Sequence, residues 1–351
     1  MKKLHYCRKL YLDRHAARKA KPVARYRRML RPRRIQVDQQ SMIRPVTVHA
    51  PKNFYLLDSV SREQLFYFFD RIEEALRSGR RVKINFEKTD GLHPCGTLVF
   101  MARLDLWLEK YPDKMTAGYP NDEVVEQLFQ NLSVLEKLGL SPRRKISSER
   151  VAYWNFYSGS KADLSGFKDT TLSIIKGIEH PNQMLFADCL NEAVCNTVGH
   201  AYKYYTEEDV PSHLRRWWIF SEFRDDRMFV AIYDAGHGIP STLRRKPEWV
   251  EYLRVRHYND DRIIQSAIVS NRTSTLQPER GKGLPEMLEF SQSLRGGGLS
   301  ILSSKGAFYY DASTGTPRRR KFALPLPGTL VQWAIPFRKE HGNGNNELLN
   351  S

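Results

Sequence analysis

The order of apolar patterns across residues 166–338 constrains the fold of this chain more than any other feature. Some stretches have the 3.6-residue spacing of amphipathic helices, and others alternate with the two-residue period of strands. The expected helices cover 182–202, 249–269 and 284–294, and the expected strands cover 217–223, 228–233, 299–303, 306–311 and 329–335. Helices grouped on one side of a mostly antiparallel sheet are the expected arrangement, which is an α/β sandwich within an α+β chain.

Residues 43–142 follow a different pattern, in which strands and helices alternate. The expected strands are 45–50, 81–86 and 114–118, and the expected helices are 61–76, 97–108 and 122–132. Such alternation predicts a small α/β domain with a mainly parallel sheet, and Ser61 is expected to cap its first helix. The pattern resembles a STAS-type regulatory module. Such modules carry a phosphorylatable Ser or Thr near the position of residues 90–97, where Thr89 and Thr97 are available.

The charge of the chain is concentrated at its start. Residues 1–34 hold fourteen of the 56 Lys and Arg residues and one acid, Asp13. We therefore expect residues 1–42 to be a basic, disordered arm. Such an arm can neutralise the phosphates of nucleic acid or of anionic lipid, and a solvated tail without a partner is the alternative.

The remaining segments are expected to connect or end the folded parts: 143–165 as a linker and 339–351 as a polar tail. No apolar run approaches the roughly 20 residues that a membrane-spanning helix needs. The basic start lacks the apolar core of a secretory signal. A cytoplasmic location without a membrane span is the resulting prediction.

The predicted helix 182–202 carries the first candidate chemistry. Glu192 and Asn196 are four residues apart and therefore share one face of this helix. A carboxamide oxygen is a neutral ligand suited to Mg²⁺ whose charge is already balanced by phosphates. A carboxylate one turn away can orient or deprotonate a water. On its own such a pair is usually only a solvated helix face.

Three further motifs follow along the chain. Asp234 comes directly after a predicted strand, with Gly236 and Gly238 behind it, and these glycines allow a close turn against a flat ligand. Residues 280–284, Arg-Gly-Lys-Gly-Leu, begin a predicted helix, where backbone N–H groups and a lysine can meet an anion. The last motif, 327–331, enters the final strand.

In this order and spacing, the four motifs resemble the nucleotide site of the ATPase superfamily of gyrases, heat-shock chaperones, histidine kinases and mismatch-repair proteins (GHKL). The resemblance covers about half of the chain. It implies a Bergerat fold, in which helices cover one face of a mixed, mostly antiparallel sheet, for the ATP-binding domain 166–338. It also implies ATP and Mg²⁺ as ligands.

The resemblance assigns roles at the matching positions. Asn196 looks like the Mg²⁺ ligand, and Glu192 looks like the base that activates water in hydrolysing members. Asp234 looks like the acceptor for the adenine amine, with Gly236 and Gly238 shaping that pocket. The other matching positions are the phosphate-side residues Gly281, Lys282, Gly283 and Leu284, and Thr329, which supports the adenine site. Residues 240–280 would form the ATP lid, with 270–280 as its mobile part.

The chain departs from the family pattern at two points. Pro285 stands where many members have a further glycine, and it is tolerated in the first turn of a helix. His180 precedes a proline and cannot lie comfortably within a helix, which disfavours a histidine autokinase.

Three functions stay open at this point. The first is an ATP-dependent regulator with a protein partner or substrate, which includes an anti-sigma-type serine kinase coupled to the STAS-like module. The second is a nucleic-acid-associated ATPase that uses residues 1–34, for example in a defence or mobile-element system. The third is a module that binds ATP without turnover. A homodimer is compatible with each of them.

Overall fold

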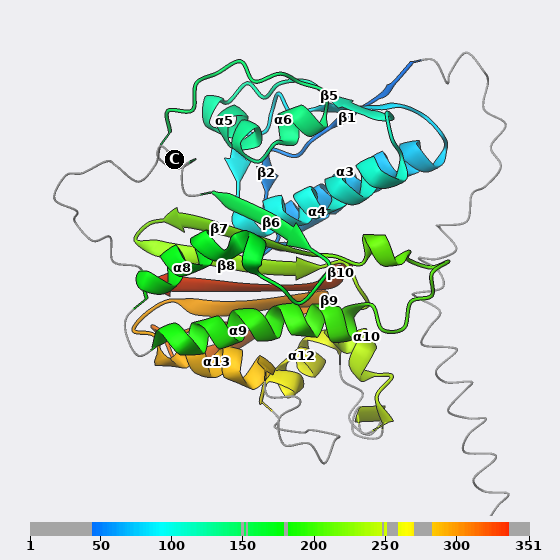
Figure 1. The fold of residues 1–351 in the computed structure, drawn as a ribbon. Helices are drawn as coiled ribbons and strands as arrows, with labels where there is room; N and C mark the ends of the chain where they lie inside the picture. The colour runs from blue at the N-terminus through cyan, green and yellow to red at the C-terminus, as the bar shows by residue number, and fades with distance from the viewer. Residues whose placement is uncertain are drawn as a thin grey trace, which may run out of the picture.

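A computed structural model describes residues 44–148, 151, 154–178, 182–247, 249–250, 259–269 and 283–336. These residues form an α+β protein, as predicted (Figure 1). Lys282, Gly281, His180, the basic arm and the predicted mobile part of the lid lie outside them. None of the helices in the described part has the length and apolarity to cross a bilayer.

The N-terminal unit is built around a parallel sheet. Its strands are β1 (Val46–His49), β2 (Asn53–Phe54), β3 (Val82–Asn85), β4 (Gly91–Leu92) and β5 (Met115–Ala117). Its helices are α3 (Ser59–Arg77), α4 (Pro94–Lys110), α5 (Glu123–Asn131) and α6 (Val134–Lys137). β1, β3 and β5 pair in that order, always in parallel, which confirms the predicted parallel sheet. β2 and β4 form a separate short parallel pair.

Helix α3 begins two residues before the predicted cap. Asp58 is the N-cap, and its Oδ1 accepts a hydrogen bond from the Ser61 backbone N–H at 2.9 Å. The prediction of Ser61 as the cap was therefore wrong, because Asp58, which is also a favoured N-cap residue, lies three positions earlier and accepts the capping hydrogen bond.

The C-terminal unit contains the larger sheet. Its strands are β6 (Asn155–Gly159), β7 (Trp217–Arg224), β8 (Arg227–Asp234), β9 (Gly298–Asp311) and β10 (Thr316–Pro336). Its α-helices are α8 (Lys168–Lys176), α9 (Asn182–Asn196), α10 (Ile239–Leu243), α12 (Asp260–Val269) and α13 (Gly283–Ser293). In the described residues the strand order is β6-β7-β8-β10-β9, and every neighbouring pair is antiparallel. β6 falls within the predicted linker, so that prediction was wrong for residues 155–159.

Strand β9 reverses its direction halfway. Fourteen residues of straight strand would separate its ends by roughly 40 Å. Instead, the Ala312 N–H donates to the Gly297 carbonyl at 3.0 Å, so the two ends lie side by side. The reversal occurs near Ser304, which has a φ of 53°. The separate strands predicted over 299–303 and 306–311 are the two arms of β9.

Both faces of the larger sheet are covered, but by different parts of the chain (Figure 1). Because side chains alternate along a strand, Trp217 and Ile219 pack toward α9 and α13, while Trp218 and Phe220 pack toward the N-terminal unit. α4 of the N-terminal unit contacts the face that carries Trp218, because Asp105 Oδ2 accepts a hydrogen bond from Trp218 Nε1 at 3.0 Å. The N-terminal unit therefore lies on the opposite side of the sheet from α9.

Candidate functional site

Helix α9 presents the first pair of predicted site residues. Its core face carries Phe186, Leu190 and Val194, which are buried against the sheet. Glu192 and Asn196 are half-buried, and Asn196 Nδ2 donates to Glu192 Oε1 at 3.0 Å. This bond points the amide nitrogen at the carboxylate and leaves the amide oxygen directed elsewhere. The predicted helix continues past Asn196 only as a wider turn, a π-helix over Thr197–Ala201.

The start of α13 packs directly against Glu192. A Cβ on Gly283 would collide with the Glu192 side chain, so any larger residue there would force that side chain to move. The first described residue of α13 consequently lies beside the Glu192 side chain. Burial, and then the nearby charge of Glu286, raise the pKa of Glu192 despite its bond from Asn196. Leu284 is partly buried and packs against the core beneath α13.

Asp234 ends β8 as a buried carboxyl group. It is only 6% exposed, and its Oδ1 accepts a hydrogen bond from the Gly236 N–H at 2.8 Å. Its partner in the β-ladder is Thr329, whose backbone N–H also donates to the carboxylate. Burial raises the pKa of Asp234 to about 7, although both of these hydrogen bonds lower it. Both hydrogen bonds come from backbone N–H groups, so the loop and β10 together hold this carboxyl group in place.

The loop after Asp234 is held from two sides. The His237 N–H donates to the Ala201 carbonyl at 2.8 Å, and a Cβ on Gly236 would collide with the same carbonyl. On the other side, Gly238 has a φ of 77° and lies against Gly328. The glycines therefore let the loop lie flat between the end of α9 and the start of the last strand segment.

Two residues that the sequence analysis did not assign to the site also shape this loop. Tyr202 accepts a hydrogen bond from the Ala235 N–H at 3.1 Å and donates to the Arg216 carbonyl at 2.7 Å. Ser303 Oγ accepts from the Ile239 N–H at 2.9 Å and donates to the Gly328 carbonyl at 2.7 Å. Tyr202 ends the first motif and could have been suspected, whereas Ser303 has no sequence signal because only the β9 reversal brings it here.

The described site residues thus gather along the C-terminal part of α9. Gly283 lies beside Glu192, Glu192 is bonded to Asn196, and five residues later Ala201 contacts the Asp234 loop. Thr329 lies opposite Asp234, with its hydroxyl 3.1 Å from Ser303 Oγ. Residues that are far apart in sequence therefore surround one region, which combines a buried acceptor, a helix N-terminus and a carboxylate–carboxamide pair. Among the described residues, no group of three or more His, Cys, Asp or Glu side chains is arranged to hold a metal ion.

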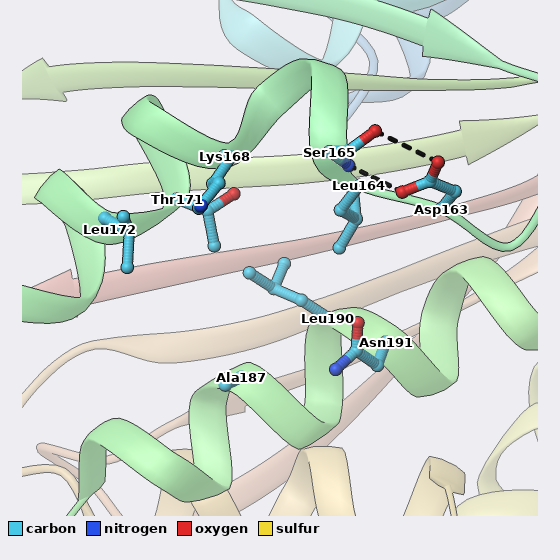
Figure 2. A pocket seen from close by; sticks show the side chains of 9 residues that line it. All are labelled: Asp163, Leu164, Ser165, Lys168, Thr171, Leu172, Ala187, Leu190 and Asn191. Atoms are coloured by element: carbon cyan, nitrogen blue, oxygen red, sulfur yellow. Dashed lines mark hydrogen bonds between the residues drawn. The ribbon is translucent and has the colours of Figure 1, made fainter.

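A separate cavity of about 210 Å³ lies between α8 and α9, and Figure 2 shows the side chains that line it. α9 contributes Ala187, Leu190 and Asn191 to it, and none of the predicted site residues. The carboxylate among these side chains, Asp163, accepts hydrogen bonds from the backbone N–H and the hydroxyl of Ser165. This carboxylate therefore already has local partners.

Comparisons with known proteins do not assign this chain to a family. A scan against protein-family models finds no match, and a search of the curated proteins finds no similar sequence. The functional conclusions below therefore rest on the residues of this chain.

Proposed function

We propose that residues 166–338 are an ATP-binding domain with the Bergerat fold of the GHKL superfamily, and that they bind Mg·ATP. The observation that carries this proposal is the buried carboxyl group of Asp234, set in a glycine loop beside Glu192, Asn196 and the start of α13. An exocyclic amine of a purine is a donor that fits such an acceptor. The triphosphate would then extend along α9 toward Gly283.

The charges near α13 favour a nucleotide that arrives with a divalent cation. The N-terminus of a helix attracts phosphate, but Glu192 and Glu286 both lie near this one. Two carboxylates repel a bare triphosphate, and Mg²⁺ bridging the phosphates would remove that repulsion. The amide oxygen of Asn196 is the group on α9 that would ligate the ion.

The N-terminal unit resembles a STAS-type module, and we propose that it regulates the ATP-binding domain without being its phosphorylation target. It packs on the face of the sheet opposite α9. Thr89 and Thr97 are fully buried, and Thr89 Oγ1 donates to the Pro51 carbonyl at 2.9 Å. A kinase activity would therefore need an acceptor other than these two threonines.

Replacing Asn196 with alanine should weaken Mg²⁺-dependent ATP binding by roughly 10-fold or more, because the ion loses a direct ligand. Isothermal titration with and without Mg²⁺ measures this effect. Asn191→Ala is the matched control, since Asn191 lies on the same helix but lines the separate cavity of Figure 2. Equal losses in the two variants would contradict the assigned role of Asn196.

Replacing Glu192 with glutamine should leave ATP binding intact and slow turnover by about 10²- to 10⁴-fold, the range attributed to a general base. Product analysis with γ-labelled ATP also separates the open functions. Label on a protein indicates a kinase, and free phosphate indicates an ATPase. Binding without either product, and without a difference between Glu192→Gln and wild type, indicates a module that only binds ATP.

The charge of residues 1–34 favours nucleic acid as an additional partner of such an ATPase. If six to ten of the fourteen cationic side chains contact phosphates, affinity for DNA or RNA should fall by about 10³- to 10⁵-fold between 50 and 200 mM salt. Fluorescence anisotropy over a salt series measures this slope. A chain that lacks residues 1–41 should lose the binding, and salt-independent binding would exclude the idea.

A further inference from the structure

The reversal of β9 is a point where three parts of the molecule meet. We define the β9 turn as residues 303–305. Its three consecutive residues contact the Asp234 loop, the N-terminal unit and helix α12, respectively. The three residues are consecutive in the chain, so we expect a shift of one of these contacts to move the others.

The first contact reaches the candidate nucleotide site. Ser303 is fully buried, and its hydroxyl joins the Ile239 N–H, the Gly328 carbonyl and the Thr329 hydroxyl. These groups frame the Asp234 loop on the side away from α9. The position of Ser303 therefore helps to fix the position of the loop that follows Asp234.

The contact with α12 reaches the segment that follows Asp234. The Lys305 N–H donates to Asp260 Oδ2 at 3.0 Å, and Arg244 Nη2 donates to Asp260 Oδ1 at 2.7 Å. Burial on its own would raise the pKa of Asp260, but Arg244 and the Lys305 N–H hold it below its ordinary value. The β9 turn is thereby attached to both α10 and α12.

The contact with the N-terminal unit is made by Arg62 of α3. Its Nη2 donates to the carbonyls of Ser304 and Leu324, both at 3.1 Å. Its guanidinium lies 4.1 Å from the ring centroid of Phe322 and 5.1 Å from that of Phe66. The residue is 1% exposed, and burial lowers its pKa to about 10.

This arginine is costly to bury. Among the described residues its Nε and Nη1 have no hydrogen-bond partner, and no carboxylate forms an ion pair with it. An aliphatic or aromatic side chain would fill the same space without the desolvation of a charge. General packing between the two units therefore does not account for an arginine at this position. Its hydrogen bonds to the backbone carbonyls of Ser304 and Leu324 do account for it.

We infer that Arg62 is a positioning residue for the loop that follows Asp234, through which the N-terminal unit sets the nucleotide affinity of the C-terminal unit. The inference rests on the proposed ATP site for its ligand. Arg62 holds the Ser304 carbonyl, the turn places Ser303, and Ser303 holds Ile239 and Gly328 in place. Coupling of this kind is reciprocal, so bound nucleotide tightens the attachment of α3.

Replacing Arg62 with methionine in the full chain tests this inference. Methionine fills comparable space and removes the buried charge, while the Ser304 carbonyl loses its donor. We expect the Kd for Mg·ATP to rise about 5- to 50-fold, in the range of typical coupling between sites. Arg62→Lys, which keeps a donor for the carbonyls, should recover part of the affinity. Amide exchange of Ile239 should accelerate in the ligand-free methionine variant.

Arg320→Met is the matched control. Arg320 Nη1 donates to the Leu57 carbonyl at 2.8 Å across the same interface, and it is not bonded to the β9 turn. It should change neither the Kd nor the exchange of Ile239. If both variants alter them equally, or if Arg62→Met lowers only the thermal midpoint, Arg62 serves packing alone and the inference is wrong.

Two further outcomes distinguish a failure of this inference from a failure of the proposed function. If wild-type protein binds no ATP, the proposed function fails, and the exchange rate of Ile239 in the ligand-free variants still decides the role of Arg62. If Arg62→Met does not fold, wild-type protein with and without Mg·ATP decides it. Nucleotide should then slow amide exchange within α3, and unchanged exchange would overturn the coupling.

Discussion

Replacing Asp234 with asparagine should abolish ATP binding and, at the same time, make the ligand-free protein more stable at pH 8. The carboxylate is the acceptor proposed for the purine amine, and an amide side chain can turn its donor group toward that amine. Loss of a buried hydrogen bond with its partner left unpaired predicts a Kd at least about 100-fold higher. Titration of both proteins with Mg·ATP measures this change.

The stability effect follows from the pKa of Asp234, which rises from 3.8 in the unfolded chain to about 7 in the folded protein. Between these values the folded protein keeps a proton that the unfolded chain has lost, so stability falls as pH rises through this window. Above pH 7 the folded protein bears the full free-energy cost of ionising the buried Asp234, which is at most about 4 kcal/mol. Asparagine cannot ionise, so the variant should gain up to that amount at pH 8 and little at pH 4.

Urea unfolding at pH 4 and pH 8 measures the free energy of unfolding of the variant and of wild type at each pH. Asp163→Asn is a control of opposite sign, because the N–H and hydroxyl of Ser165 lower the pKa of this exposed carboxyl group. Its removal should slightly destabilise the protein at pH 8 and leave ATP binding unchanged. An Asp234→Asn protein that is less stable than wild type at pH 8 would contradict a buried, ionising carboxyl group. Retained ATP affinity would contradict the nucleotide site.

Replacing Gly328 with alanine should cost more than about 3 kcal/mol of folding free energy or prevent folding. Gly328 has a φ of 79°, and a Cβ on it would collide with the backbone carbonyl of Asp234. That carbonyl belongs to the neighbouring strand β8, so it cannot move without breaking the ladder between β8 and β10. The same displacement would shift Asp234 within the proposed site and lower ATP affinity.

Gly139→Ala is a control that shows the cost of backbone strain alone, without the collision that a Cβ on Gly328 would cause. Gly139 has a φ of 75°, but no atom lies within 4 Å of its added Cβ. This variant should therefore cost only about 1 kcal/mol, the penalty of the left-handed conformation. Chemical unfolding midpoints of the two variants compare them directly. Similar losses of stability in both variants would mean that β10 can move at Gly328 to accommodate the Cβ. The close pairing with Asp234 would then not constrain the site.

Much of the candidate site could be predicted from the sequence because its residues sit at the ends of strongly patterned elements. The period of the apolar residues predicts the helix that carries Glu192 and the strand that ends at Asp234. Glycine at 236 and 283 marked places where backbone comes close to another group, and the structure has Ala201 and Glu192 there. Gly281 and Lys282 lie outside the described residues, so their part in the site stays a prediction.

Other features had no local signal. β6 is short, half-buried and polar in part, so its sequence is typical of a linker until β7 pairs with it. The reversal of β9 separates two predicted strands, but nothing near Ser303 indicates that its hydroxyl reaches Ile239, 64 residues away. Arg62 and Ser304 are 242 residues apart, and an arginine in an amphipathic helix is ordinarily expected at the surface.

The sequence by itself determined most of the longer helices and strands, the parallel N-terminal sheet and the motif residues, because side-chain period and turn chemistry act over a few neighbouring residues. Only the tertiary structure decided that the N-terminal unit covers the face of the larger sheet opposite α9, and that Arg62 and Ser303 meet at the β9 turn. These arrangements depend on which apolar surfaces are buried against each other. That choice depends on shape and volume across the whole chain, which no local pattern records.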